Sequence, residues 1–392
     1  MRTRSSLLRG RLSGVRRRGP ALFIATLAIA LAFAGRAHAQ VQEAIDRFAS
    51  QITADVAADG VGGITAAVFR GDHVLWAQGF GWADRENRVP AGVRTVYRTG
   101  SISKSMTAVL MADLAEDGVL AFDDEVVDVL PEVAGFAEPP PGMSPITFRQ
   151  LASHTAGLIR EPRLEGAAAG PIDAWGEKVL ASIPHTSFYT MPGTQYQYSN
   201  IGYGILGYAL QRAAGEPFMQ MMQERIFDPL GMVSSTFVIG PDLARRLAVG
   251  YGGEGHGTRT PAIEHNGRGY KVPNGGVHST VADLATFAAA VMGRTEFELL
   301  RDDTRAEVVR RQTPEDGTGY GLGFFLTEVE LVDGQTVTFV GHSGGVSGYN
   351  AYLVFDPETG YGVALMRNYN VGETNLGRAG NALLRDLLAE TG

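Results

Sequence analysis

Ser101 and Lys104 are three residues apart in a predicted helix and could together perform nucleophilic catalysis. Side chains at this spacing lie on one helical face, so the hydroxyl and the amine can meet. We expect Ser101 at the helix N-terminus, where the helix dipole favours an alkoxide and, together with burial, disfavours an ammonium group. A neutral Lys104 could then accept the hydroxyl proton of Ser101. A chance pair on an exposed helix is the ordinary alternative.

The lysine content of the chain favours the catalytic interpretation. Lysine occurs only at positions 104, 178 and 271, against 31 arginines. Arginine stays protonated at any working pH, so chemistry that needs a neutral amine must use lysine. The placement of one of three lysines in this motif therefore supports Lys104 as a base.

Tyr198 and Asn200 form the only Tyr-x-Asn sequence in the chain, just before a predicted helix at 201–210. A tyrosine near a cation can have a lowered pKa and pass a proton to a leaving group, and a side-chain amide can orient a substrate amide. Taken alone, the segment is better explained by Asn200 as a helix N-cap with Tyr198 packed nearby.

Residues 341–345 read Gly-His-Ser-Gly-Gly and lie between two strand-like segments. As Gly-x-Ser-x-Gly the motif could be the nucleophile elbow of an α/β-hydrolase, with Ser343 as nucleophile. The residue order opposes this, because an elbow leads into a helix and needs a later histidine, whereas 349–355 reads as a strand and no histidine follows His342. We predict instead a strand edge at which the Gly345 N–H stabilises an oxyanion, with an ordinary glycine-rich turn as the alternative.

The flanking segments predict the elements that position these residues. Helical spacing covers 41–58, the stretch from Ser103 to a stop at Gly118, and 375–390. Strands are predicted at 64–69, 74–80, 322–328, 336–340, 348–355 and 361–366. The fold class is α/β (α+β): an antiparallel sheet flanked by helices, built from about 40–122 and 281–392, with an inserted, mainly helical subdomain at about 123–280. We expect the site between the two parts.

The N-terminus has the pattern of an export signal. The first 39 residues contain eight arginines and no acidic residue, and 21–34 is an apolar run shorter than the roughly 20 residues of a transmembrane helix. Small residues at Ala37 and Ala39 predict a signal peptide at 1–39 that is cut before Gln40. We therefore expect an exported protein, periplasmic or secreted, without stable membrane insertion after cleavage. An uncleaved anchor is the alternative, and both Sec and twin-arginine export stay open.

Composition excludes several function classes. Residues 40–392 carry 26 basic and 42 acidic residues, a formal charge of −16, which argues against nucleic acid as a partner. The lack of cysteine excludes disulfides, thiolate catalysis and cysteine-ligated metals. Glu254, His256, Glu264 and His265 have no regular ligand spacing, so we predict no metal, and we predict no cofactor. The oligomeric state stays open.

In this order and spacing, Ser-x-x-Lys, Tyr-x-Asn and His-x-Gly resemble the serine β-lactamase and penicillin-binding-protein superfamily, specifically its class C-like branch. The resemblance spans about the whole chain after the leader and includes YRTGSISKS, ITFRQLASHTAGL, MPGTQYQYSNIGYGILG, IFDPLGM and PNGGVHST. It implies a β-lactamase/transpeptidase-like fold and an acyl-enzyme on the serine. The implied roles are nucleophile for Ser101, proton carriers for Lys104 and Tyr198, substrate ligands for Asn200, His342, Ser343, Gly344 and Gly345, and oxyanion donors for the Ser101 and Gly345 N–H groups.

One motif departs from the family pattern. Dedicated class C β-lactamases have Lys-Thr-Gly where this chain has His342-Ser343-Gly344, so it looks more like the peptidase and general hydrolase members. A charged His342 could bind a substrate carboxylate, and it would lose its charge across the neutral range if its pKa were near the ordinary ~6.5. His154 belongs to the scaffold part of the resemblance, and we expect it to be buried and structural.

The sequence thus predicts a serine hydrolase that cleaves a small ester or a D-amino-acid peptide through an acyl-enzyme on Ser101. Its partner is a small-molecule or peptide substrate. The alternatives are a protein that is acylated by a β-lactam or a wall peptide without efficient turnover, and a weak β-lactamase.

Overall fold

The computed structural model describes residues 20–252, 268–332 and 334–389. A seven-stranded sheet has the order β3-β2-β1-β9-β8-β7-β6, and all its neighbouring strands are antiparallel. Its strands are β1 Gly63–Arg70, β2 His73–Asp84, β3 Val89–Pro90, β6 Phe325–Glu330, β7 Thr336–Val346, β8 Tyr349–Phe355 and β9 Tyr361–Arg367. The pairing of β1 with β9 brings strands from the N-terminal and C-terminal parts of the chain into one sheet.

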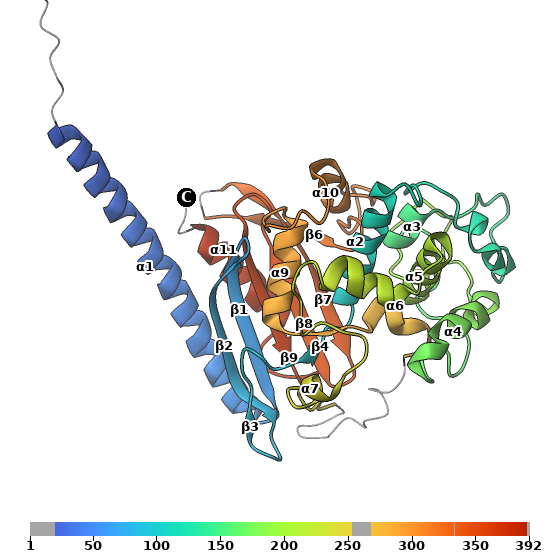
Figure 1. Ribbon diagram of the computed structural model, residues 1–392, viewed down its shortest axis with the longest axis horizontal. Helices are drawn as coiled ribbons and strands as arrows, with labels where there is room; N and C mark the ends of the chain where they lie inside the picture. Colours follow the sequence, from blue (N-terminus) through green and yellow to red (C-terminus); the bar gives the residue numbers. More distant parts are fainter. Residues whose placement is uncertain (1–19, 253–267, 333, 390–392) are drawn as a thin grey trace, which may run out of the picture.

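Helices cover both faces of the sheet because its central strands are apolar on both sides. On β1, Ala67 and Phe69 belong to one core cluster, and Ala66 and Val68 to another. The second cluster is closed by α1 Pro20–Asp59 and α11 Leu376–Ala389, and the first by α9 Val281–Val291 and α2 Ile102–Glu116 (Figure 1). This arrangement confirms the predicted antiparallel sheet flanked by helices.

The first helix begins earlier than the periodicity at 41–58 indicates. It starts at Pro20, inside the segment predicted as a signal peptide, while residues 1–19 lie outside the described residues. Over the described part of the chain, no helix combines the length and apolar character needed to cross a membrane.

A mainly helical part lies beside one end of the sheet (green and yellow in Figure 1). It consists of short helices and 3-10 turns: Val126–Asp128, Pro131–Gly135, α3 Phe148–Ala152, Ile172–Ala174, α4 Trp175–Ser182, Ile183–His185, α5 Asn200–Ala214, α6 Phe218–Met221, a π turn at Met222–Phe227, α7 Pro241–Ala244, Gly269–Lys271 and α8 Val272–Gly275. Helix α10 Asp302–Val309 follows later in the chain. Helix α2 contacts α5 and α8 on one side and β7 and β8 on the other, so its N-terminus lies between the two parts.

Two details differ from the pattern in the sequence. The two-residue strands β4 Tyr97–Arg98 and β5 His278–Ser279 pair with each other and are too short to show an alternation. Strand β7 continues through the Gly-His-Ser-Gly-Gly motif, which the pattern places between strands, and ends at Val346. Its partner β6 pairs only as far as Gly341, so His342 to Val346 extend beyond β6.

Candidate active site

Ser101 and Lys104 meet at the start of α2, as their spacing predicts. Ser101 is the N-cap residue, and its Oγ lies 3.1 Å from Nζ of Lys104. The same Nζ donates to the carbonyl oxygen of Asn274 at 3.0 Å. Lys104 is fully buried, so its amine is held in one place beside the serine hydroxyl.

The environment of Lys104 disfavours its charged form. Burial lowers its pKa well below the ordinary value, and the positive charges of Arg160 and Lys271 lower it further, while Glu161 acts in the opposite direction. An uncharged amine has a lone pair, so it can accept a proton from Ser101.

The turn before α2 lies directly against the end of β7 that extends beyond β6. Gly100 has a φ of +55°, and a Cβ atom there would lie 2.7 Å from the backbone nitrogen of Gly345. A Cβ on Gly344 would lie 1.9 Å from the carbonyl oxygen of Thr99. Only glycines allow this approach, which brings the backbone of Gly345 next to Ser101.

Tyr198 lies between two basic side chains. Its ring centroid is 4.9 Å from Nζ of Lys104 and 4.8 Å from the guanidinium carbon of Arg160. Burial raises the pKa of Tyr198 to about 12, although its hydrogen bond with Ser101 and the nearby Arg160 lower it. The expectation of a lowered pKa is therefore wrong, because the loss of solvent outweighs the hydrogen bond with Ser101 and the charge of Arg160. The phenol keeps its proton and can donate it.

Ser199, not Asn200, caps helix α5. The Ser199 hydroxyl accepts from the N–H of Gly202 at 2.9 Å, so Asn200 is the first residue of the helix and its side chain faces the site. Its Nδ2 donates to Glu161 at 2.5 Å. Its Oδ1 is buried and has no hydrogen-bond partner among the residues that the structure describes. The site therefore presents an unused acceptor.

His342 does not titrate in the neutral range. Its Nε2 lies 3.0 Å from the hydroxyl of Tyr320, and its Nδ1 lies 2.6 Å from the carbonyl oxygen of Ser343. These partners fit a neutral ring that donates from Nδ1 and accepts at Nε2. Burial lowers the pKa of His342 to about 3, and Lys104 adds to the effect. The hypothesis of a cationic His342 that binds a carboxylate is therefore wrong.

Ser343 differs from His342 and Ser101 in its exposure. Its side chain is exposed on β7, whereas those of His342 and Ser101 are buried or half-buried. Strand β7 is followed by β8 and not by a helix, so the geometry of a nucleophile elbow is lacking at this position.

His154 is a packing residue, as expected. It is 1% exposed, its Nδ1 accepts from the N–H of Ser199 at 3.1 Å, and burial lowers its pKa well below the ordinary value. Four tyrosine rings surround it, at positions 196, 198, 203 and 320, and the ring of Tyr198 is 4.2 Å away between centroids. The His154 ring thus packs against the ring of Tyr198 and holds it in position.

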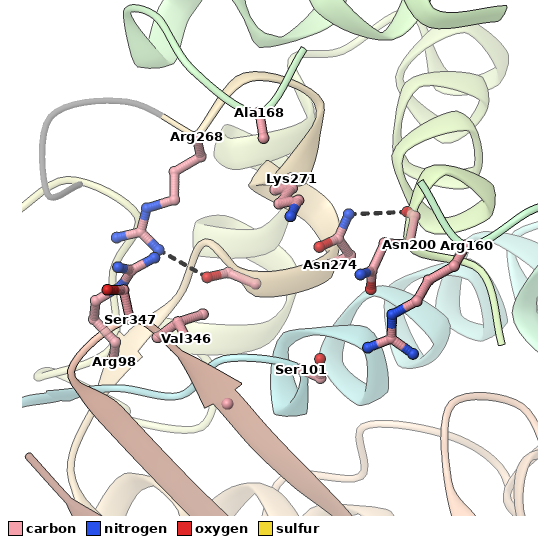
Figure 2. A pocket seen from close by; sticks show the side chains of 12 residues that line it. Arg98, Ser101, Arg160, Ala168, Asn200, Arg268, Lys271, Asn274, Val346 and Ser347 are labelled. Atoms are coloured by element: carbon pink, nitrogen blue, oxygen red, sulfur yellow. Dashed lines mark hydrogen bonds between the residues drawn. The ribbon is translucent and has the colours of Figure 1, made fainter. Parts of the chain in front are cut away.

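A pocket of about 240 Å³ opens beside Ser101 (Figure 2). Asn200 and Gly345 line it, and neither His342 nor Ser343 is among its described lining residues. The other lining residues are Arg98, Arg160, Ala168, Arg268, Lys271, Asn274, Gly275, Val346 and Ser347. The sequence motifs did not indicate these basic residues, although the rarity of lysine was a signal for Lys271.

The four residues weighed as metal ligands at 254–265 lie outside the described residues. Within the described ranges, no group of three or more His, Cys, Asp or Glu side chains could hold a metal ion.

Comparisons with known proteins agree with this fold. The chain is 26% identical over 332 residues to the D-alanyl-D-alanine-carboxypeptidase/endopeptidase AmpH of Escherichia coli, with 81% of each chain covered. The octameric penicillin-binding protein homologue from Pyrococcus abyssi superposes with a TM-score of 0.71 at 26% identity, covering 88% of this chain and 76% of that one. The β-lactamase/D-alanine carboxypeptidase from Yersinia pestis superposes with a TM-score of 0.68 at 23% identity, covering 89% and 98%, and shares the fold. The similarity to AmpH supports serine hydrolase activity in general. The β-lactamase family profile matches residues 48–387, and the chain belongs to that family, within the serine β-lactamase and penicillin-binding-protein superfamily.

Proposed function

We propose that the chain is a serine hydrolase that transfers an acyl group to Ser101 and then to water. The contact between Ser101 Oγ and the buried Nζ of Lys104 carries this proposal, because a neutral amine 3.1 Å away is the base that the hydroxyl needs. No other described lysine contacts a serine hydroxyl in this way.

The proposed first half-reaction forms the acyl-enzyme. Ser101 Oγ attacks the substrate carbonyl carbon as its proton passes to Nζ of Lys104. The N–H groups of Ser101 and Gly345 stabilise the oxyanion. Tyr198 then donates its phenolic proton to the leaving oxygen or nitrogen as that bond breaks, and it regains a proton from the Lys104 ammonium.

The second half-reaction restores the enzyme. Water attacks the acyl carbon and gives a proton to Lys104, and the tetrahedral intermediate collapses with return of a proton to Ser101 Oγ. The product is a carboxylic acid. A substrate therefore needs an ester or amide carbonyl that can reach Ser101.

For the substrate we propose a peptide ending in a D-amino acid or a small ester. The support is the similarity to AmpH, whose name gives D-alanyl-D-alanine carboxypeptidase and endopeptidase activity, and the His342 motif in place of Lys-Thr-Gly. Such a substrate suits the proposed signal peptide at 1–39, cut before Gln40, and export to the periplasm or beyond.

Intact-mass measurement after exposure to a fluorophosphonate or a β-lactam tests the nucleophile. One adduct is expected on the wild type and none on Ser101→Ala, and an adduct that maps to Ser343 would refute the assignment. Turnover of a D-Ala-D-Ala peptide, a D-amino acid amide, a p-nitrophenyl ester and a cephalosporin then identifies the substrate class. Adducts with no turnover of any of these would indicate the alternative, a protein that is acylated and stalls.

A further inference from the structure

The pocket beside Ser101 has a positive lining in an acidic protein. Arg98, Arg160, Arg268 and Lys271 are four of its twelve described lining residues, and none of the twelve is Asp or Glu. The whole chain has a formal charge of −8. Basic side chains that gather against the overall charge raise the local concentration of an anion.

Nearby acid neutralises Arg160 and Lys271 only in part. Glu161 lies 3.3 Å from Nζ of Lys271 and 3.9 Å from Nε of Arg160, so one carboxylate serves two cations. It also accepts from Asn200 and contacts the hydroxyl of Tyr270. The Arg160 side chain is 61% exposed, so its guanidinium can reach a ligand.

The pocket lies on the acyl side of the proposed reaction. Tyr198, which donates to the leaving group in that reaction, is not among the described lining residues. Gly345 lines the pocket together with Ser101, and the lining also includes Val346 and Ser347 (Figure 2). A group bound there stays attached to Ser101 when the leaving group departs.

Asn200 supplies an independent sign of a ligand. It is only 8% exposed, it lines the pocket, and its Oδ1 has no hydrogen-bond partner in the described part of the chain. Because one N–H of Nδ2 donates to Glu161, the orientation of the amide is fixed and Oδ1 is the atom left for a ligand donor. A buried acceptor without a hydrogen bond costs free energy, and a ligand donor that bonds to it removes that cost. The complementary ligand group is an N–H.

We propose that this pocket selects acyl groups that carry a carboxylate, bound by Arg160 and Lys271, and an amide N–H that donates to Asn200. The proposal rests on the proposed function, since the acyl group is the part that Ser101 retains. Its substrate class is an acidic peptide-like acyl donor, for which Arg offers paired donors and Lys a point charge.

Two matched esters test the carboxylate. The p-nitrophenyl ester of N-succinyl-D-alanine and the same ester with its succinyl carboxylate methylated share the leaving group and the amide N–H. We expect a kcat/KM ratio of at least about tenfold in favour of the free carboxylate, the factor that corresponds to about 1.4 kcal/mol. A ratio near one in the wild type would overturn the proposal without any mutant.

Charge-removing variants locate the binding groups. Arg160→Met and Lys271→Met should each lower the ratio severalfold, whereas Arg163→Met and Lys178→Met, which lie outside the pocket lining, should keep it. A ratio that neither pocket variant changes would overturn the assignment. Fluorophosphonate labelling distinguishes the two proposals. Labelled Ser101 with a kcat/KM ratio near one refutes only the carboxylate-binding pocket, whereas loss of labelling at Ser101 refutes the proposed function.

Discussion

Nζ of Lys104 lies 3.1 Å from Oγ of Ser101 and simultaneously donates to the carbonyl oxygen of Asn274 at 3.0 Å. The second contact orients the amine, because one N–H is used by the carbonyl and the lone pair remains for the serine proton. A base must also be uncharged before it accepts a proton, and burial favours this because it disfavours the charged form of Lys104.

Lys104→Arg should be nearly as damaging as Lys104→Ala. A guanidinium keeps the positive charge but cannot become neutral, so it cannot act as the base. Loss of a general base lowers kcat/KM by about 10²–10⁴-fold, roughly 3–5 kcal/mol in the transition state. Steady-state kinetics on folded variants check this. A Lys104→Arg enzyme that kept most of its kcat/KM would mean that Lys104 serves only as a positive charge.

Tyr198→Phe should lower kcat more than it raises KM. The ring would still pack on His154 and face Lys104, so ground-state binding is retained, while the proton for the leaving group is lost. Because the pKa of Tyr198 is raised to about 12, the phenol is protonated at neutral pH and able to donate. An unchanged kcat would assign Tyr198 to packing alone.

Lys104→Met should make the protein more stable at neutral pH. In the fold the pKa of Lys104 is lowered by burial, whereas in the unfolded chain it is about 10.4. The unfolded chain therefore binds more protons, and the stability of the wild type rises with pH through this window. Urea unfolding at pH 7 and pH 9 should show the advantage of the Met variant shrinking as pH rises. A constant difference would show that Lys104 is charged in the fold.

Local pattern in the sequence was sufficient for most of the elements and for the contact between Ser101 and Lys104. The spacing of Ser101 and Lys104 determines their contact on α2, and strand-like runs bounded by turn residues predicted β1, β2, β8 and β9. The cap of α5 could not be predicted, because Ser199 and Asn200 are adjacent and both are good N-cap residues.

Burial and long-range contacts account for what the sequence did not predict. The pKa values of Tyr198 and His342 depend on loss of solvent, and the partner of His342 is Tyr320, 22 residues away. Arg160 and Lys271 reach the pocket from separate segments, and each shows no local pattern that marks it as part of a site.

His342 should contribute to stability and not to pH-dependent binding. Since its pKa is lowered to about 3, KM for a carboxylated peptide should not change between pH 6 and 8 through this residue. His342→Phe leaves the buried hydroxyl of Tyr320 without this partner, which should lower the free energy of unfolding by about 1–3 kcal/mol. A KM that rises with pH in the wild type, but not in the variant, would show that His342 is charged and binds the substrate carboxylate.

Gly100→Ala should impair both stability and catalysis, and Gly118→Ala is its matched control. Both glycines have positive φ, +55° and +73°, so each alanine introduces strain of about 1–2 kcal/mol. Among the described residues, nothing lies within 4 Å of a Cβ on Gly118. A Cβ on Gly100 lies 2.7 Å from the Gly345 nitrogen and must push β7 away from Ser101.

The displacement would disturb the proposed oxyanion donors, whose loss costs about 10²-fold or more in kcat. We therefore expect similar thermal shifts from strain in the two variants, a further loss of stability in Gly100→Ala, and a large fall in kcat in Gly100→Ala alone. Thermal unfolding and ester hydrolysis measure the two effects separately. A Gly100→Ala enzyme with the kcat of Gly118→Ala would show that the approach of β7 to the start of α2 is not required for catalysis.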